Sequence, residues 1–258
     1  MVSANFMEKV EANRYLNPPK VQRVRYARNF IKTAVCELRF PALLELETKP
    51  PRAFQKEIRK TYPFYEPQIV EMGSGSDDIT RENRYLFRSK DKQWTVSVKS
   101  FSLALETSKY VDFEDFFQRL TALLERSREM IDADFFTRVG LRYINNVPLE
   151  DGIVDGWIRA ELLSPLMGGV LGVPKSIASV VSGEMDGGFY TLRHGRKDEN
   201  APDAKVQQYT LDFDYYAENV EAKDVPARVK QFNEINFALF SWCLGDKARK
   251  LLGEGRPK

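Results

Sequence analysis

The sequence predicts an α+β protein built from two similar α+β halves, with long helices packed on one face of a mainly antiparallel sheet. Three observations favour this class. Several short segments alternate apolar and polar residues, which is the period of a half-buried strand. Two longer segments, 113–130 and 225–243, repeat apolar residues at helical spacing. The order of strand, helix, hairpin and long helix in the first half is followed by a similar order in the second.

The composition is that of a folded globular chain. Its 258 residues are 43% hydrophobic and 12% aromatic, enough for a core without disulfide bonds. With 39 Lys and Arg against 37 Asp and Glu, the chain lacks the strong positive charge of a protein that mainly coats nucleic acid. Cys36 and Cys243 lie in hydrophobic settings and are expected to be buried thiols. We expect a cytoplasmic protein with no membrane partner, because no signal peptide or membrane span is evident.

Three regions are predicted along the chain. Residues 1–28 form a basic N-terminal arm, residues 29–132 the first α+β half and residues 133–258 the second, with both halves in one compact unit. The arm is polar, and Pro18-Pro19 interrupts it. It is interpreted either as a solvated extension or as a surface that touches nucleic acid or an acidic partner.

In the first half, residues 31–40 are a predicted strand that Pro41 closes. A hairpin is predicted at 85–98, and its second strand is expected to continue to Leu105 with a bend near Ser100, where the apolar parity changes. The other predicted elements are an amphipathic helix at 52–62 and a long helix that follows Asp112 as its N-cap, with an apolar stripe from Phe113 to Met130.

The second half begins with a strand at 136–146 whose faces have opposite character. Val139 and Tyr143 point to the apolar face, whereas Arg138, Gly140 and Arg142 point to the other. Gly140 is expected to let the two arginines flank an open spot or a close backbone approach. The elements predicted after it are a helix at 154–163, a packing loop at 165–174, strands at 176–185, 188–193 and 206–216, and a closing helix that begins after Asp224 and breaks at Gly245.

If the strands join in one sheet, the faces without helices collect charged side chains. One interpretation is a solvated face with cross-strand ion pairs, in which Arg138 and Arg142 neutralise acidic residues. The other is a groove for a partner or an anionic ligand, because arginine forks suit carboxylate and phosphate. The candidate binding residues are Arg39, Glu106, Arg138, Arg142, Tyr143, Asn145, Asp212 and Asp214.

No catalytic residue, cofactor or metal ligand is predicted. His194 is the single histidine and is expected at a surface or hairpin end. Neither a nucleophile-elbow motif nor a zinc-protease motif is present. The enzymatic alternative is a metal-dependent enzyme acting on an anionic substrate, in which Asp212 and Asp214, with Glu106 or Glu184, hold a hard cation such as magnesium.

Five blocks of the sequence carry a resemblance to a known family: 29–41 (NFIKTAVCELRFP), 101–110 (FSLALETSKY), 138–146 (RVGLRYINN), 211–216 (LDFDYY) and 233–247 (NEINFALFSWCLGDK). In this order they resemble an uncharacterised prokaryotic family that is described as sporadically distributed. The sequence departs from it at the front, where Asn29-Phe30-Ile31 takes the place of an Asn-Pro-Pro-Ile-like start.

This resemblance implies no established activity. Patchy distribution is typical of accessory genes, so the resemblance implies a role in an accessory system, such as a defence or toxin–antitoxin system. A non-catalytic binding or adaptor protein is the preferred interpretation, because binding by a charged sheet face requires less of the sequence than catalysis. The expected partner is another protein or a second copy of the chain, with nucleic acid as a further option through the basic arm or the charged sheet face.

Overall fold

The computed structural model of the chain describes residues 14–72, 80–150, 153–163, 171, 176–197 and 207–253. Apart from Leu171, the predicted packing loop at 165–174 lies outside these residues, as does the first part of the arm. The chain divides into two compact units. Unit 1 comprises Met1–Lys32, Tyr143–Tyr215 and Gln231–Lys258, and unit 2 comprises Thr33–Arg142 and Tyr216–Lys230. This division differs from the predicted boundaries, because strands β6 and β9 contribute to both units.

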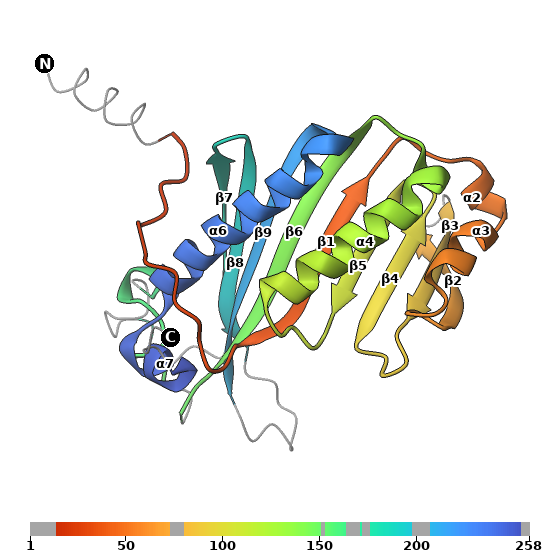
Figure 1. The fold of residues 1–258 in the computed structure, drawn as a ribbon. Coiled ribbons are helices and arrows are strands. Elements are labelled where there is room, and N and C mark those ends of the chain that lie inside the picture. The colour runs from red at the N-terminus through yellow and green to blue at the C-terminus, as the bar shows by residue number, and fades with distance from the viewer. Residues whose placement is uncertain are drawn as a thin grey trace, which may run out of the picture. The chain divides into compact units, whose positions relative to one another are not determined.

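The fold is α+β, with a nine-stranded sheet in the order β2-β3-β4-β5-β1-β6-β9-β8-β7 (Figure 1). The pairs β2–β3, β3–β4, β4–β5, β1–β5 and β7–β8 are antiparallel. The strands are β1 (Ile31–Arg39), β2 (Phe64–Met72), β3 (Thr80–Arg88), β4 (Trp94–Lys99), β5 (Ser102–Thr107), β6 (Phe135–Pro148), β7 (Ser176–Met185), β8 (Gly188–Lys197) and β9 (Gln208–Glu221). The helices are α2 (Glu45–Thr48), α3 (Arg52–Ile58), α4 (Phe113–Ile131), α6 (Val225–Cys243) and α7 (Asp246–Leu252), with 3₁₀ turns η1 (Ala160–Leu162) and η2 (Ala222–Asp224).

In unit 2, helix α4 covers one face of strands β1, β4 and β5 (Figure 1). The β1 residues on the covered face, Ala34, Cys36 and Leu38, are fully buried, as the alternation of the sequence predicts. Asp112 is the N-cap of α4, as predicted: its carboxylate accepts a hydrogen bond of 3.0 Å from the Asp115 backbone N–H.

In unit 1, helix α6 packs on aromatic side chains of strand β9. The ring of Phe240 meets Phe213 edge-on at 6.4 Å, and Phe232 stacks on Tyr215 at 6.5 Å. The described part of the N-terminal arm also packs against this unit. The hydroxyl of Tyr26 lies 3.3 Å from Ser241 Oγ on α6, and the Leu16 backbone N–H donates to the Glu184 carbonyl, so residues 14–28 lie along unit 1 with most of their side chains exposed.

Several predicted elements are corrected. The strand expected to bend near Ser100 is two strands, β4 and β5, joined by a tight turn at 100–101. Near Ser100 the apolar residues switch from even to odd positions or the reverse, and such a switch occurs both at a bulge and at a turn that reverses the chain. The switch alone therefore did not distinguish a bent strand from two strands. Residues 154–163 form turns, isolated bridges and η1 rather than one helix. Strand β2 was not predicted; it contains Pro67 and lies at the edge of the sheet, where proline is tolerated.

Two further expectations concern the whole chain. Cys36 and Cys243 are both free and buried, as predicted. Among the described helices, none is long and apolar enough to cross a membrane.

Candidate functional site

The strands of unit 2 present a charged surface on the face opposite α4. Glu37 lies directly across from Ala104 of β5, and Ala104 lies across from Ser97 of β4, so these three share a face. Strand alternation extends this face along each strand. We call it the charged face; its charged residues are Glu37, Arg39, Glu66, Glu82, Arg84, Arg88, Lys99, Glu106, Arg138 and Arg142.

A carboxylate between two arginines forms the centre of the charged face. Glu37 Oε2 accepts from Arg39 Nε at 3.0 Å and from Arg138 Nη1 at 3.4 Å. The side chains of Arg39, Glu37 and Arg138 are 45%, 26% and 19% exposed. The Glu37 carboxylate thus holds two guanidinium groups at a surface that solvent and a ligand can reach.

Arg138 is held from two further sides. Its guanidinium carbon lies 4.4 Å from the centre of the Tyr216 ring, which is cation–π geometry. Its Nη1 lies over Gly140, where a Cβ atom would come within 2.8 Å of it. The space predicted to be open beside Gly140 is therefore filled by the Arg138 guanidinium itself.

Charges of opposite sign alternate over the rest of the charged face. Arg88 Nε lies 3.1 Å from Glu66 Oε2, and Lys99 Nζ lies 2.7 Å from Glu82 Oε2. Hydrogen bonds from Gln68 and Arg88 hold the pKa of Glu66 below its usual value.

The structure brings together some of the predicted binding residues on the charged face. Arg39 and Arg138 meet at Glu37, and Glu106 lies two residues along β5 from Ala104, the neighbour of Glu37. Arg142 is half-buried on β6, on the same face as Arg138 by strand alternation.

Tyr143 and Asn145 do not belong to this surface, because both are buried in unit 1. The Tyr143 hydroxyl donates to Asn233 Oδ1 of α6 at 3.2 Å, and Asn145 Nδ2 donates to the Leu211 carbonyl at 3.2 Å. Both side chains therefore satisfy polar groups inside the core.

Asp212 and Asp214 also lie in unit 1, on strand β9. Asp212 is buried, with its Oδ2 3.9 Å from Nη1 of Arg193, and Asp214 is half-buried. Within the described ranges, no three His, Cys, Asp or Glu side chains are grouped so that they could hold a metal ion. Glu184, which with Glu106 was also considered for a metal site, forms an ion pair with Arg14 at 3.1 Å.

His194 is buried instead of lying at a surface. Strand β8 continues to Lys197, so the residue lies inside the strand, only 6% exposed, with Nδ1 2.8 Å from the Tyr209 hydroxyl. Burial lowers its pKa below 6.5, so its imidazole is neutral at physiological pH.

The two cysteine thiols are poor nucleophiles. Burial raises the pKa of the Cys36 thiol to about 12 and also raises the pKa of Cys243.

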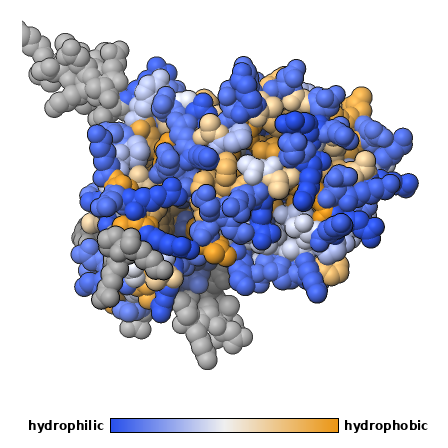
Figure 2. Space-filling view, viewed as in Figure 1, coloured by the Kyte–Doolittle hydropathy of each residue, from blue (hydrophilic) through white to orange (hydrophobic). Residues whose placement is uncertain are grey.

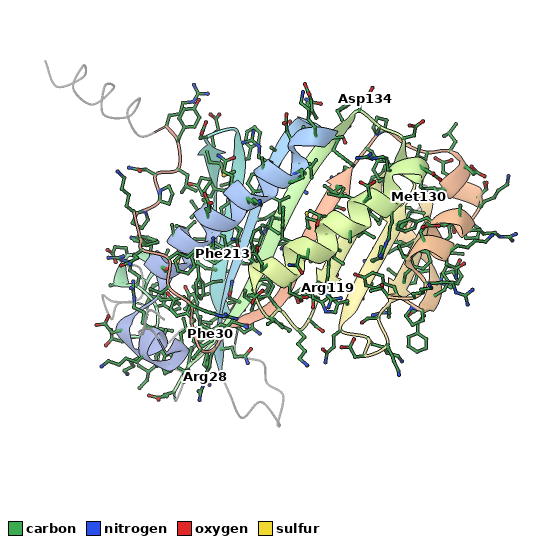
Figure 3. All side chains as sticks on the ribbon, in the orientation of Figure 1. Arg28, Phe30, Arg119, Met130, Asp134 and Phe213 are labelled. Carbon is green, nitrogen blue, oxygen red and sulfur yellow. The ribbon has the colours of Figure 1, made fainter. Side chains whose placement is uncertain are left out.

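Unit 2 also contains two grooves beside α4. One has a volume of about 1030 Å³ and lies where the end of α4 meets the start of β6 and η2, near Asp134 in Figure 3. The other, of about 900 Å³, lies beneath α2, α3 and the last turns of α4, which carry Met130. The first is lined by pairs such as Arg128 with Glu125 and Lys223 with Glu221, which neutralise each other.

Comparison with known proteins adds no family and no activity. No family model matches the sequence, and no curated protein matches it. One solved structure, the di-domain ARO/CYC StfQ from the steffimycin biosynthetic pathway, is 11% identical over 86% of this chain and 98% of that chain. The TM-score is 0.20, which is too low to support an argument about fold or function.

Proposed function

We propose that this protein is a non-catalytic binding or adaptor protein of an accessory prokaryotic system, and that the charged face of unit 2 engages its macromolecular partner. The observation that carries the proposal is the arrangement of Arg138, which Glu37 and Tyr216 hold in place above Gly140. A guanidinium fixed in this way loses less conformational entropy when it binds a carboxylate or phosphate.

The distribution of charge indicates the type of partner. Arginine and lysine alternate with glutamate over the charged face, as in the Arg88–Glu66 and Lys99–Glu82 pairs. Mixed charges of this kind suit a protein surface of complementary pattern and set its orientation. A uniform phosphate backbone would favour a surface of one sign. We therefore infer that the partner at this face is a protein.

We also propose that the fold is a duplication of two α+β halves. The order of the strands supports this. From the middle of the sheet outward the strands follow β1-β5-β4-β3-β2 on one side and β6-β9-β8-β7 on the other, so the first and last strands of each half are neighbours. A helix of 19 residues, α4 or α6, follows the last strand of each half. Glu37 of β1 and Arg138 of β6 thus join the first strands of the two halves.

The test is affinity purification of tagged protein from its native host, with identification of copurified proteins and sequencing of copurified nucleic acid. We compare wild type with a variant carrying Arg39→Ala and Arg138→Ala. A matched control carries Arg52→Ala and Arg59→Ala on or beside α3, where both side chains are exposed. The charged-face variant is expected to lose the partner and the control to retain it.

Two results would overturn the proposal. One is equal recovery of the same partner with the charged-face variant, the control and wild type. The other is a magnesium-dependent turnover by the purified protein that Asp212→Asn abolishes, which would favour the enzymatic alternative.

A further inference from the structure

A second charged surface lies on unit 1 and has a different character. We call residues 14–30 the strap. It contains Arg14, Lys20, Arg23, Arg25 and Arg28 and no acidic residue. Helix α7 adds Lys247, Arg249 and Lys250 against Asp246 alone. The formal net charge of the whole chain is only +2, so these two segments hold all of its excess positive charge and the remainder is net negative.

Contacts within unit 1 place the strap beside α6 and α7. The Arg28 backbone N–H donates to the Leu252 carbonyl at the end of α7 at 3.2 Å. Ala27 lies beside Gly253, where a Cβ atom on the glycine would come within 3.1 Å of the Ala27 Cβ. Figure 3 labels Arg28 close to α7. The strap thus leads to the end of α7, and we call the exposed basic side chains of these two segments the row; they are Lys20, Arg23, Arg25, Arg28, Lys247 and Lys250.

Two aromatic rings interrupt this row of positive charge. Tyr26 and Phe237 lie 5.9 Å apart and are both half-buried, and the Arg23 guanidinium lies 5.8 Å from the Phe237 ring. In Figure 2, the surface in view is mainly hydrophilic, with smaller hydrophobic areas between the polar side chains. Basic side chains beside partly exposed rings are used by proteins that track a single nucleic-acid strand and stack its bases.

Between Lys20 and Arg28 no helix or strand is assigned, and the chain bends at Ala27 and Arg28. A segment of this length reaches at most about 28 Å, enough to follow several nucleotides of an extended strand. Peptide carboxylates would use the arginines but not the rings, so a single nucleic-acid strand fits the row better than an acidic protein.

We propose that the strap and α7 bind single-stranded nucleic acid without sequence preference, with phosphates against the arginine and lysine side chains and a base against the Tyr26–Phe237 pair. This surface lies in unit 1, and the inference does not rest on the function proposed for the charged face.

The test is fluorescence polarisation of a labelled oligothymidylate of about twenty nucleotides, a length that exceeds the expected site. Wild type is expected to bind, with an affinity that falls as salt rises. The variant Lys20→Glu, Arg23→Glu, Arg28→Glu is expected to bind at least about tenfold more weakly, with a salt slope smaller by about two, because three phosphate contacts are lost. A matched control, Arg52→Glu, Lys56→Glu, Arg59→Glu, makes the same change of charge at α3 and is expected to bind within about twofold of wild type.

A second pair of measurements separates nucleic acid from an acidic protein. Phe237→Leu keeps an apolar side chain at the strap and is expected to weaken oligothymidylate binding about fivefold or more, with no effect on polyglutamate of equal charge. Circular dichroism verifies that each variant is folded. The proposal is overturned if wild type fails to bind, or if the α3 control loses as much affinity as the strap variant. It is also overturned if polyglutamate binds as tightly and Phe237→Leu changes neither affinity.

Discussion

The guanidinium of Arg138 stacks on Tyr216 at 4.4 Å on the charged face of unit 2. The contact joins β6 to β9 and orients the arginine toward Glu37. A partly exposed cation–π pair stabilises a fold by about 0.5–1 kcal/mol. A double-mutant cycle with Arg138→Ala and Tyr216→Leu, followed by urea unfolding, is expected to give a coupling energy in this range. Additive effects of the two substitutions would show that the stacking contributes nothing.

Gly140→Ala is expected to act on Arg138 rather than on the strand. The added Cβ would come within 2.8 Å of Arg138 Nη1, which lies at the mobile end of its side chain. The guanidinium would move away from Tyr216 and Glu37, at a cost of about 1 kcal/mol or less, because alanine itself suits a strand better than glycine. Loss of the partner in the affinity purification, with the unfolding midpoint little changed, would support this account. Retention of the partner would contradict it.

Tyr143→Phe is expected to destabilise unit 1 although it removes a single oxygen atom. The hydroxyl donates to Asn233 Oδ1, and the Nδ2 of the same asparagine is already buried without a partner in the described structure. Leaving a buried acceptor without its donor costs about 1–3 kcal/mol. Urea unfolding measures the loss. Tyr65→Phe on β2, where the side chain is exposed, is the control and is expected to change the free energy of unfolding by less than about 0.5 kcal/mol.

His194 is expected to make the stability of the protein depend on pH. Its pKa is lowered by burial, so the unfolded chain binds a proton that the folded chain excludes. The stabilisation is present above the ordinary pKa of 6.5 and is lost as the pH falls below that value toward the folded pKa. Urea unfolding at about pH 7.5 and about pH 5.5 is expected to show a loss that His194→Gln reduces. His194 is the only histidine, so an equal loss in the variant would assign the effect to other groups.

Local patterns predicted much of the fold. Alternation located β1, β7 and most of β9, and an apolar stripe with a capping aspartate located α4. The errors occurred where a local signal has two structural outcomes. The parity change at Ser100 fits a bulge or a turn, and Pro67 in β2 is compatible with a strand only at an edge, which depends on strand order.

The candidate site was predicted only in part for the same reason. Alternation assigns Arg39 and Arg138 to charged strand faces, but it does not show which strands are neighbours. Strand β6 lies between β1 and β9, and Glu37 of β1, which was not among the candidate residues, pairs with Arg138. The predicted pairing of Arg138 and Arg142 with Asp212 and Asp214 stays a prediction. Tyr143 was expected on the apolar face of its strand and was also proposed as a binding residue. Its hydroxyl instead donates a hydrogen bond to Asn233 inside the core.

Photo-crosslinking in native cells tests most directly whether the charged face binds the partner. A photoreactive phenylalanine analogue replaces Thr95 or Glu106 on the charged face, and Glu57 or Lys60 on or beside α3 in control proteins. The account predicts one partner adduct from both charged-face positions, its loss when Arg138→Ala is added, and no such adduct from the control positions. The same adduct from the α3 positions alone, or an adduct from the charged face that Arg138→Ala leaves unchanged, would contradict it.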